Sequence, residues 1–402
     1  MSFANNLFLR GVLPAASLAL VAPTALAAAD DDGKVTFKVT YRYEYVDHEG
    51  DEVANASNAD LLVGYKTPSH EGVFGYFETE TVAPIGDEKF NSTVNGLAKY
   101  PVVLDPEGSE INQMYIGYSG DALPKTSIKV GRQRIILDNA RHIGNVGWRL
   151  NEMTYDAATV VNSSVENLTL IGSYVWNANT ISGANLIVDM GAVVNAGYSI
   201  ADIGKLSGYA YLFDYSDASG LRDQATYGAR LAGSRKLNDN LKAIYEAEFA
   251  TQSAYADTDE LGVSYFHIVA GAGFSDYWLK GGYESQGSEA GTASFRTFTG
   301  TNHAFNGWAD RFLATPVSGL SDLYVGAGGK VAAVNGLAFA AFFHDFAAVE
   351  GDAHYGTEID GVVKYKHDAH HSFGAKCASF SADEYAPDNN TTKFWAWVTH
   401  TF

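Results

Sequence analysis

The sequence predicts an all-β protein, a transmembrane antiparallel β-barrel of about 18 strands with short turns at one end and long loops at the other. Three observations lead to this fold class. Apolar and polar residues alternate along runs of about 10 residues, the spacers between runs alternate between short and long, and the chain ends in an aromatic residue, Phe402. Strands of soluble sheets typically have about 5–6 residues, which argues against a soluble sandwich or propeller.

The first residues form a predicted signal peptide. Arg10 precedes an apolar run, and the tripeptide ALA at 25–27 has the small-x-small pattern of a cleavage site. We expect residues 1–27 to be removed, with an alternative cut after residue 29. An N-terminal membrane anchor is the other interpretation, but the apolar run is too short to span a bilayer. Residues 28–402 then form one domain in the outer membrane of a Gram-negative bacterium.

Three runs show the alternation most clearly. KVTFKVTYRYEYV (34–46) places Tyr41 and Tyr43 on one face of a strand and Arg42 and Glu44 on the other. NLKAIYEAEFATQ and GTEIDGVVKYKH, further along the chain, repeat this scheme. In hydrocarbon every backbone N–H and C=O must be paired within the protein, so strands can span a membrane only as a closed barrel. Apolar residues then face lipid and polar residues face the lumen.

The spacers and strand ends support the same fold. PSHE, ADIG, LNDN and VNG are short, whereas residues 83–109 and 287–320 form the longest predicted loops. An even strand number places both termini and all short turns at the periplasmic end. The last run, TTKFWAWVTHTF, has Phe394, Val398 and Phe402 on one face. Aromatic residues near strand ends suggest membrane-interface girdles: Tyr115, Tyr118, Tyr174, Trp176, Tyr209, Tyr211, Tyr277 and Trp278.

Three stretches resemble the alginate export family of proteobacterial outer-membrane proteins. They are GRQRIILDNARHIGNVGWRLNEMTYDA (131–157), LKGGYESQGS (279–288) and NHAFNGWADRFLATPVSGLSDLY (302–324). The resemblance implies a monomeric, eighteen-stranded channel. Resemblance to the best-understood type of that family also implies an electropositive lumen that accepts a polyanion.

The first of these stretches concentrates arginines in a chain whose formal net charge is −20. Arg132, Arg134, Arg141 and Arg149 are predicted to line the pore or its mouth, because guanidinium groups stay charged and pair with anions in anion-selective pores. Strict alternation from Val130, however, directs Arg132 and Arg134 towards lipid. Either a bulge at Gly131 resets the register, or these two arginines lie at the rim and contact lipopolysaccharide phosphate. Arg141 and Arg149, in the loop, are the firmer pore-mouth candidates.

The rest of the predicted lumen is mixed in charge. Opposed basic and acidic walls suit small polar solutes better than a long polyanion, which acidic loops such as DHEGDEV would also repel. The predicted lining residues from the strands are Lys38, Arg42, Lys242, Glu246, Glu248, Lys280, Glu284 and Lys330.

The longest loop contains NHAFNGWADRFLATP, a candidate constriction. His303, Asn306, Trp308, Asp310 and Arg311 offer hydrogen bonds and a stacking surface at the channel mouth. The alternative is that the aromatic residues of this segment form the small hydrophobic core that a long ordered loop needs. Both descriptions can hold together.

We therefore predict an outer-membrane channel, a porin that passes small charged or hydroxylated solutes by diffusion through a constricted, charge-lined lumen. The alternatives are an exporter of an anionic polysaccharide such as alginate and a surface receptor or adhesin that acts through its long loops. Expected partners are outer-membrane lipid, lipopolysaccharide and a small-molecule or oligosaccharide solute, with no nucleic acid.

An enzyme is not predicted. The chain has no G-x-S-x-G, H-E-x-x-H or Walker A motif. KHDAHH (366–371) is a candidate metal ligand set, but a solvated periplasmic turn is the favoured interpretation. No catalytic residue, metal site or cofactor is predicted.

Overall fold

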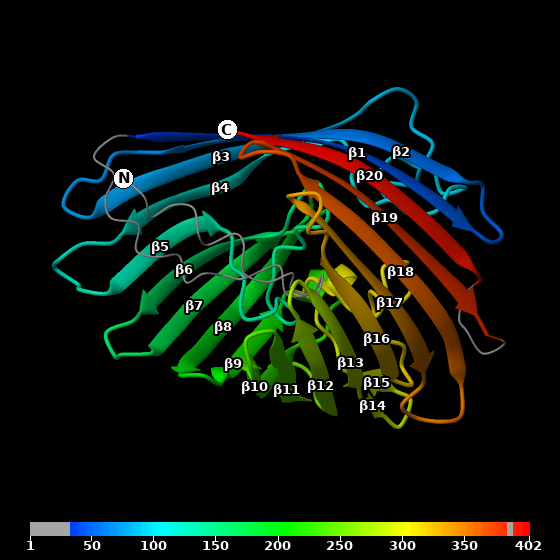
Figure 1. Ribbon diagram of the computed structural model, residues 1–402. Coiled ribbons are helices and arrows are strands. Elements are labelled where there is room, and N and C mark those ends of the chain that lie inside the picture. The colour runs from blue at the N-terminus through cyan, green and yellow to red at the C-terminus, as the bar shows by residue number, and fades with distance from the viewer. Residues whose placement is uncertain (1–32, 384–388) are drawn as a thin grey trace.

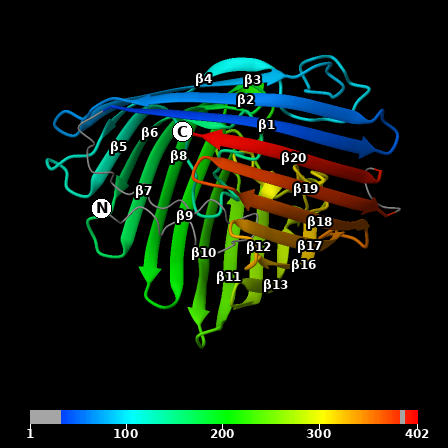
Figure 2. The same ribbon diagram turned by 45° about the horizontal axis from the view of Figure 1, so that its top comes forward.

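Eighteen antiparallel strands form one closed barrel, in which consecutive strands pair and β20 returns to pair with β1 (Figure 1). The computed structural model describes residues 33–383 and 389–402, and the predicted signal peptide lies outside these ranges. The predicted fold class and strand number are confirmed. In Figure 2, blue β1 and red β20 lie side by side and close the wall.

The strands have the following bounds: β1 Lys34–His48, β2 Ala54–Lys66, β3 Val73–Pro84, β4 Gly108–Tyr118, β5 Thr126–Gln133, β6 Thr154–Asn162, β7 Leu168–Asn179, β8 Asn185–Ile200, β9 Gly204–Tyr215, β10 Gln224–Lys236, β11 Leu241–Ser253, β12 Gly262–Phe274, β13 Tyr277–Gln286, β16 Leu320–Lys330, β17 Leu337–Ala347, β18 His354–Lys366, β19 His371–Ala382 and β20 Thr391–Thr401. A small hairpin, β14 Ser288–Glu289 and β15 Ala293–Ser294, and two 3-10 turns, η2 Asp217–Ser219 and η3 Asn302–Ala304, lie in loops. Within the described ranges, no helix has the length and apolar character needed to cross a membrane.

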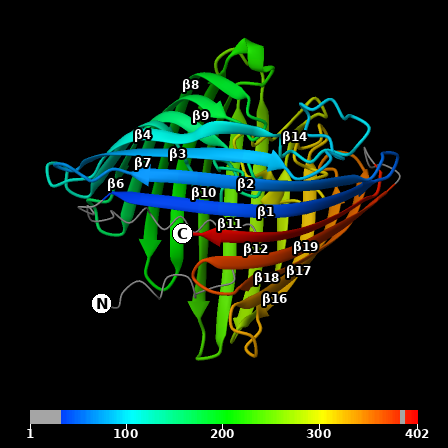
Figure 3. The ribbon, with the colours of Figure 1, turned by 90° about the horizontal axis from the view of Figure 1, so that it is seen from above.

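The two ends of the barrel differ in their connections. One end carries short turns, such as residues 201–203 between β8 and β9 and residues 275–276 between β12 and β13. The opposite end carries the longest connections, residues 85–107, 134–153 and 287–319. We call these the short-turn end and the long-loop end. In Figure 3, seen from above, the blue strands of one wall cross in front of the green strands of the opposite wall.

Side-chain exposure follows the predicted alternation. In β18, Glu358 and Asp360 are each 1% exposed, whereas Ile359 between them is 62% exposed. In β11, Phe249 is exposed and Glu248 is buried. Because a barrel presents its outer face to the surroundings, the exposed apolar residues mark the lipid-facing wall and the buried polar residues mark the lumen.

Only part of the predicted aromatic girdle lies on the outer wall. Tyr174, Trp176 and Tyr277 are exposed there. Tyr209 and Tyr211 are buried inside, where their rings stack with centroids 4.8 Å apart. Tyr115 and Trp278 also face the interior. The girdle assignment is therefore wrong for these four residues, because an aromatic residue near a strand end can take either parity.

Candidate functional site

The three longest loops fold into the barrel, and we call residues 85–107, 134–153 and 287–319 the inserted loops. The backbone N–H groups of Trp308 and Ala309 donate to Asp360 and Glu358 on the inner face of β18, at 3.2 and 2.7 Å. The lumen carboxylates therefore hold the backbone of the longest loop, which gives its otherwise orphaned amides partners.

Loops 134–153 and 287–319 bind each other through their backbones. Gly144 N donates to Thr299 O at 2.8 Å, and Thr301 N donates to Ala140 O at 2.9 Å. Ala140 lies in the left-handed region with φ 64°. Tyr155, at the start of β6, closes the contact by donating its hydroxyl to Gly144 O at 2.7 Å. The two loops thus form one unit inside the barrel.

Arg141 anchors this unit to the wall. Its side chain is 1% exposed, and its Nε lies 2.7 Å from Oε1 of Glu284 on β13. Its terminal nitrogens donate to Asn302 at 3.1 Å and Asn306 at 2.9 Å. Burial alone would lower the pKa of Arg141, but Glu284 and Tyr265 together raise it. Arg141 therefore stays charged and fully engaged.

Arg149 anchors the other side of the same loop. Its guanidinium lies 2.9 Å from Glu44 of β1 and 3.1 Å from Asp310 of the longest loop. Asp105, from the third inserted loop, pairs with Arg42 of β1 and lies 3.7 Å from Arg149. Burial would raise the pKa of Asp105, but Arg42 and Arg149 together lower it. This network joins all three inserted loops to β1.

An inward lysine that sequence reasoning missed completes the attachment. Lys376 of β19 is 5% exposed, and its ammonium lies 4.0 and 4.1 Å from the ring centroids of Trp148 and Trp308. It also lies 2.5 Å from Nε2 of His303, whose Nδ1 contacts Asp310. Cation–π contacts of this kind are strongest when desolvated. The alternation of SFGAKCASFSA could have identified Lys376 as inward-facing.

The candidate constriction segment lies inside the barrel, where it makes both apolar and polar contacts. Trp308 and Phe312 are buried in a hydrophobic cluster with residues of β13 and β16–β20. Asn306 is also buried, and its amide donates to Glu284 at 3.0 Å. Arg311 reaches His48 at 3.4 Å. The segment therefore packs its aromatic residues against the inner wall of the barrel and also presents polar groups inside it.

Arg132 and Arg134 lie on opposite sides of the wall. Pairing of β5 with β4 and β6 runs through Gly131 without a register shift, so the bulge considered there is not present. Arg132 keeps the outward parity of Val130, and its Nε donates to Asp156 at 2.8 Å. Arg134 follows the end of β5, turns inward, and pairs with Glu152 and Glu78. Arg132 lies within β5 and follows its alternation, whereas Arg134 lies beyond the last strand residue, Gln133, and can turn inward.

The interior contains a chamber of about 820 Å³ between the inserted loops and the short-turn end. Residues of the loops, such as Asn306 and Trp308, line it on one side, and residues near the short turns, such as Ser127 and Ser199, line it on the other. Its charged lining residues are Lys129, Arg134, Lys205, Arg230, Lys242, Lys280, Asp138, Glu246, Glu284 and Asp322. A smaller cavity of about 320 Å³ adjoins β1–β3. Among the described residues, Arg134 alone lines both cavities.

Three lysines of the chamber have no ion-pair partner. Within residues 33–383 and 389–402, Lys129, Lys242 and Lys280 have no carboxylate oxygen within 4.0 Å of their ammonium nitrogens, whereas Lys205 pairs with Asp138 at 2.9 Å. Lys129 lies 4.9 Å from the ring centroid of Tyr115. Lys280 lies 5.3–5.7 Å from three aromatic rings. Aromatic faces hold these cations without neutralising them, so the chamber keeps a local positive charge.

The remaining predicted lining residues are spread over the wall. Glu246 and Glu284 line the chamber, and Glu248 is buried behind them. Lys38 lies 3.7 Å from Asp60 and lines the smaller cavity. Arg42 is engaged by Asp105 and by the backbone oxygen of Trp148. Lys330 ends β16 near the short turns, away from both cavities.

A closed eighteen-stranded barrel with inserted loops and a charged inner wall is the architecture of outer-membrane porins, and solved structures of that class resemble this chain. OccK9 (OpdG) of Pseudomonas aeruginosa has a TM-score of 0.73 at 13% identity, covering 92% of this chain and 98% of its own. OccAB4 of Acinetobacter baumannii has a TM-score of 0.69 at 12% identity, covering 92% and 98%. OpdK of P. aeruginosa with vanillate has a TM-score of 0.73 at 10% identity, covering 93% and 100%.

These identities establish the fold alone. No family model and no curated protein matches the sequence. The resemblance to the alginate export family is therefore wrong: the solved structures like this chain are Occ and Opd porins, and no family match supports alginate export. The motifs that carried the resemblance, in 131–157 and 302–324, build the loop contacts of Arg141 and Asn306 in this structure.

Proposed function

We propose that this protein is a monomeric outer-membrane channel through which small charged or hydroxylated solutes diffuse, with a preference for anions. Transport involves no bond chemistry. Selection comes from the width left beside the inserted loops and from the charges of the inner wall. The Occ and Opd barrels support this proposal through their shared fold.

The three unpaired lysines of the chamber carry the proposed preference. A positive charge between walls of low dielectric raises the local concentration of small anions. Lys129 stands on β5, Lys242 on β11 and Lys280 on β13, so the charges are distributed around the chamber. Two of the acidic lining residues, Glu246 and Glu284, are paired with Arg230 and Arg141. Their negative charges therefore offset the positive charge of the three lysines only weakly.

The chamber volume supports a small solute. About 820 Å³ falls in the range of about 300–1,000 Å³ that encloses single small molecules. Vanillate, a small aromatic anion, is present in a structure of the similar barrel OpdK. Aromatic residues such as Tyr115 and Trp278 in the chamber lining offer stacking surfaces to a solute of this kind.

Planar-bilayer recordings under a potassium chloride gradient test the proposal. We expect stable conductance steps and a reversal potential on the anion side. The triple variant Lys129→Gln, Lys242→Gln and Lys280→Gln should shift the reversal potential towards the cation side. Lys99→Gln with Lys236→Gln removes exposed lysines outside both cavities and should leave it nearly unchanged.

Two results would contradict the proposal. A folded barrel that never conducts would exclude the channel and favour a receptor acting through its loops. A channel whose reversal potential does not respond to the triple variant would exclude the lysines as the source of selectivity.

A further inference from the structure

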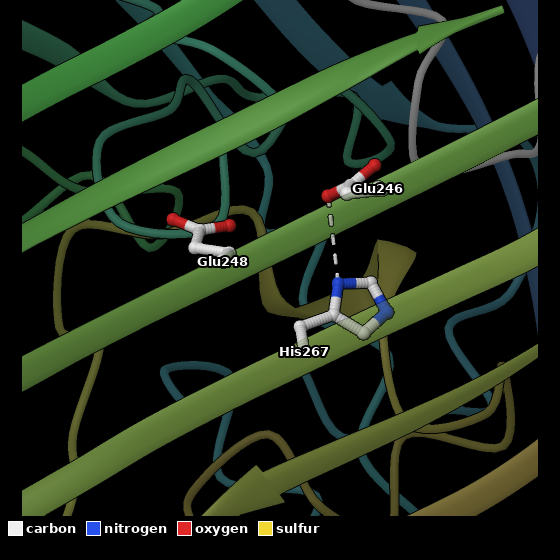
Figure 4. A group of neighbouring side chains, drawn as sticks. All are labelled: Glu246, Glu248 and His267. Carbon is white, nitrogen blue, oxygen red and sulfur yellow. Dashed lines mark ion pairs between the residues drawn. The ribbon is translucent and has the colours of Figure 1, made fainter.

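Glu246, Glu248 and His267 form a compact ligand set on the inner wall (Figure 4). The two glutamates come from β11 and the histidine from β12, where His267 pairs directly opposite Glu248 in the strand register. One side-chain ligand atom from each residue lies within 4.8 Å of the others. Figure 4 shows the imidazole turned towards the carboxylate of Glu246, and the two groups are 3.5 Å apart.

Two atoms of this set have no hydrogen-bond partner among the described residues. They are Nδ1 of His267 and Oε2 of Glu248, on side chains that are 5% and 2% exposed. Buried polar atoms are nearly always satisfied, so an unsatisfied pair on neighbouring strands points to a ligand. Imidazole nitrogen and carboxylate oxygen are the donors that first-row divalent metals take.

The opposite sides of the same side chains are held in place. Nε2 of His267 lies 3.0 Å from the hydroxyl of Tyr324. The other oxygen of Glu248 accepts from Tyr209 at 2.6 Å and lies 3.1 Å from His142. A partner on the second ring nitrogen fixes the tautomer and orientation of a metal-binding histidine. These contacts leave Nδ1 of His267 and Oε2 of Glu248 without a hydrogen bond, each with one ion-pair neighbour, Glu246 at 3.5 Å and Arg230 at 3.6 Å.

Two carboxylates beside one guanidinium leave a net negative charge at this ligand set. Arg230 pairs with Glu246 at 2.8 Å and lies 3.6 Å from Glu248, so one cation already shares the two carboxylates. The second nearby arginine, Arg141, is fully committed to Glu284. A divalent ion must therefore compete with Arg230 for both glutamates. At Oε2 of Glu248 and Nδ1 of His267 it meets only ion-pair contacts of 3.6 and 3.5 Å and displaces no hydrogen bond.

We propose that Glu246, Glu248 and His267 bind a divalent transition-metal ion, with zinc as the representative ion, at the wall of the chamber. Three protein ligands leave a coordination position for water or for an anionic group. Glu246 and His267 line the chamber, so that position faces the solute space. The site departs from the sequence-based expectation of no metal site. It goes beyond the proposed channel function and does not depend on it.

Zinc binding to the purified barrel in detergent tests the site by isothermal titration calorimetry, with magnesium as the comparison ion. We expect one zinc ion per barrel and little heat with magnesium, because imidazole suits zinc and not magnesium. His267→Gln and Glu248→Gln should each weaken zinc binding at least tenfold. His344→Gln, which changes another buried chamber histidine beside a carboxylate, should bind zinc like the unchanged protein.

Absence of zinc binding in the unchanged protein overturns the proposal, and so does equal zinc affinity in both His267→Gln and Glu248→Gln. His371→Gln tests the exposed pair His371 and His400, whose ring nitrogens lie 3.0 Å apart near the C-terminus. Loss of zinc binding in that variant would also overturn the proposed site. Calorimetry needs no conduction, so this test and the bilayer test of the channel fail independently.

Discussion

Arg141 shows how one buried side chain can hold a loop inside a barrel. Its guanidinium pairs with Glu284 and with two asparagines of the neighbouring loop, and it is almost completely excluded from solvent. A buried ion pair adds little net stability, since both charges lose their hydration. Removing one partner is costly, because the other charge stays buried and uncompensated.

Arg141→Met should therefore lower the free energy of unfolding by about 3–5 kcal/mol. Arg132→Met is the matched control from the same stretch, because its partly exposed pair with Asp156 lies on the outer wall. That change should cost no more than about 1 kcal/mol. Urea titration in micelles measures both. Equal effects of the two substitutions would contradict a special anchoring role for Arg141.

Gly131 is required by its backbone conformation rather than by a bulge. Its φ is +126°, and a Cβ atom there would lie 2.3 Å from the backbone oxygen of Met114 on the paired strand. Gly131→Ala should destabilise the barrel by about 1–3 kcal/mol through this strain. Gly172→Ala in β7 is the control, because its Cβ would meet no atom within 4 Å. A comparison of the urea midpoints of the two variants checks this, and a neutral Gly131→Ala would refute it.

At the scale of elements, the strands could be predicted and the loop positions could not. Alternation locates Glu248, Glu358 and Ile359 correctly, because side-chain direction in a strand depends only on neighbouring residues. The inward fold of 287–319 depends on partners far away in sequence, such as the contact of Ala309 with Glu358. Alternation does not predict the direction of the Arg134 side chain, because this residue follows the last residue of β5.

The anchoring groups of the inserted loops give them a defined pH response. Neutral His303 accepts a hydrogen bond from Lys376 and donates to Asp310. Burial lowers its pKa to about 3. For Asp310, burial would raise the pKa, but His303, Lys393 and Arg149 lower it well below its usual value.

Both shifts make acid destabilising, in separate pH windows. An unfolded histidine gains a proton near pH 6.5, whereas folded His303 stays neutral, so stability falls from about pH 6.5 downward with a slope of at most about 1.4 kcal/mol per pH unit. The stability that Asp310 contributes is fully present above its unfolded pKa near 4 and is lost as the pH falls through the lower folded value.

Urea midpoints between pH 4 and 7.5 check this assignment. The unchanged protein should lose stability steadily as the pH falls from about 6.5 to 4, and His303→Gln should reduce that slope. His354→Gln, at an exposed histidine of the long-loop end that pairs with Asp345 and Asp383, should leave this slope in place. A slope that persists unchanged in His303→Gln would assign it to another group.

At the scale of the molecule, the net charge of −20 does not describe the inner wall. Composition averages over acidic loop tips, such as Asp51 and Glu52, that lie on the surface. The local excess of positive charge arises because Lys129, Lys242 and Lys280, from three separate strands, all line the chamber. Parity indicates that such residues face inward, but which of them lack a carboxylate partner depends on cross-barrel geometry that one sequence does not contain.

This charge distribution predicts how the selectivity should depend on salt. The Debye length is about 10 Å at 0.1 M salt and about 3 Å at 1 M, so the lysines should act across the chamber only in dilute salt. We expect the anion preference measured from reversal potentials to be clear near 0.1 M potassium chloride and to decline strongly near 1 M. The triple glutamine variant should show little change over the same range. A preference that is equally strong at both concentrations would instead indicate direct binding of anions at a desolvated site, because screening weakens long-range attraction more than contact with a buried charge.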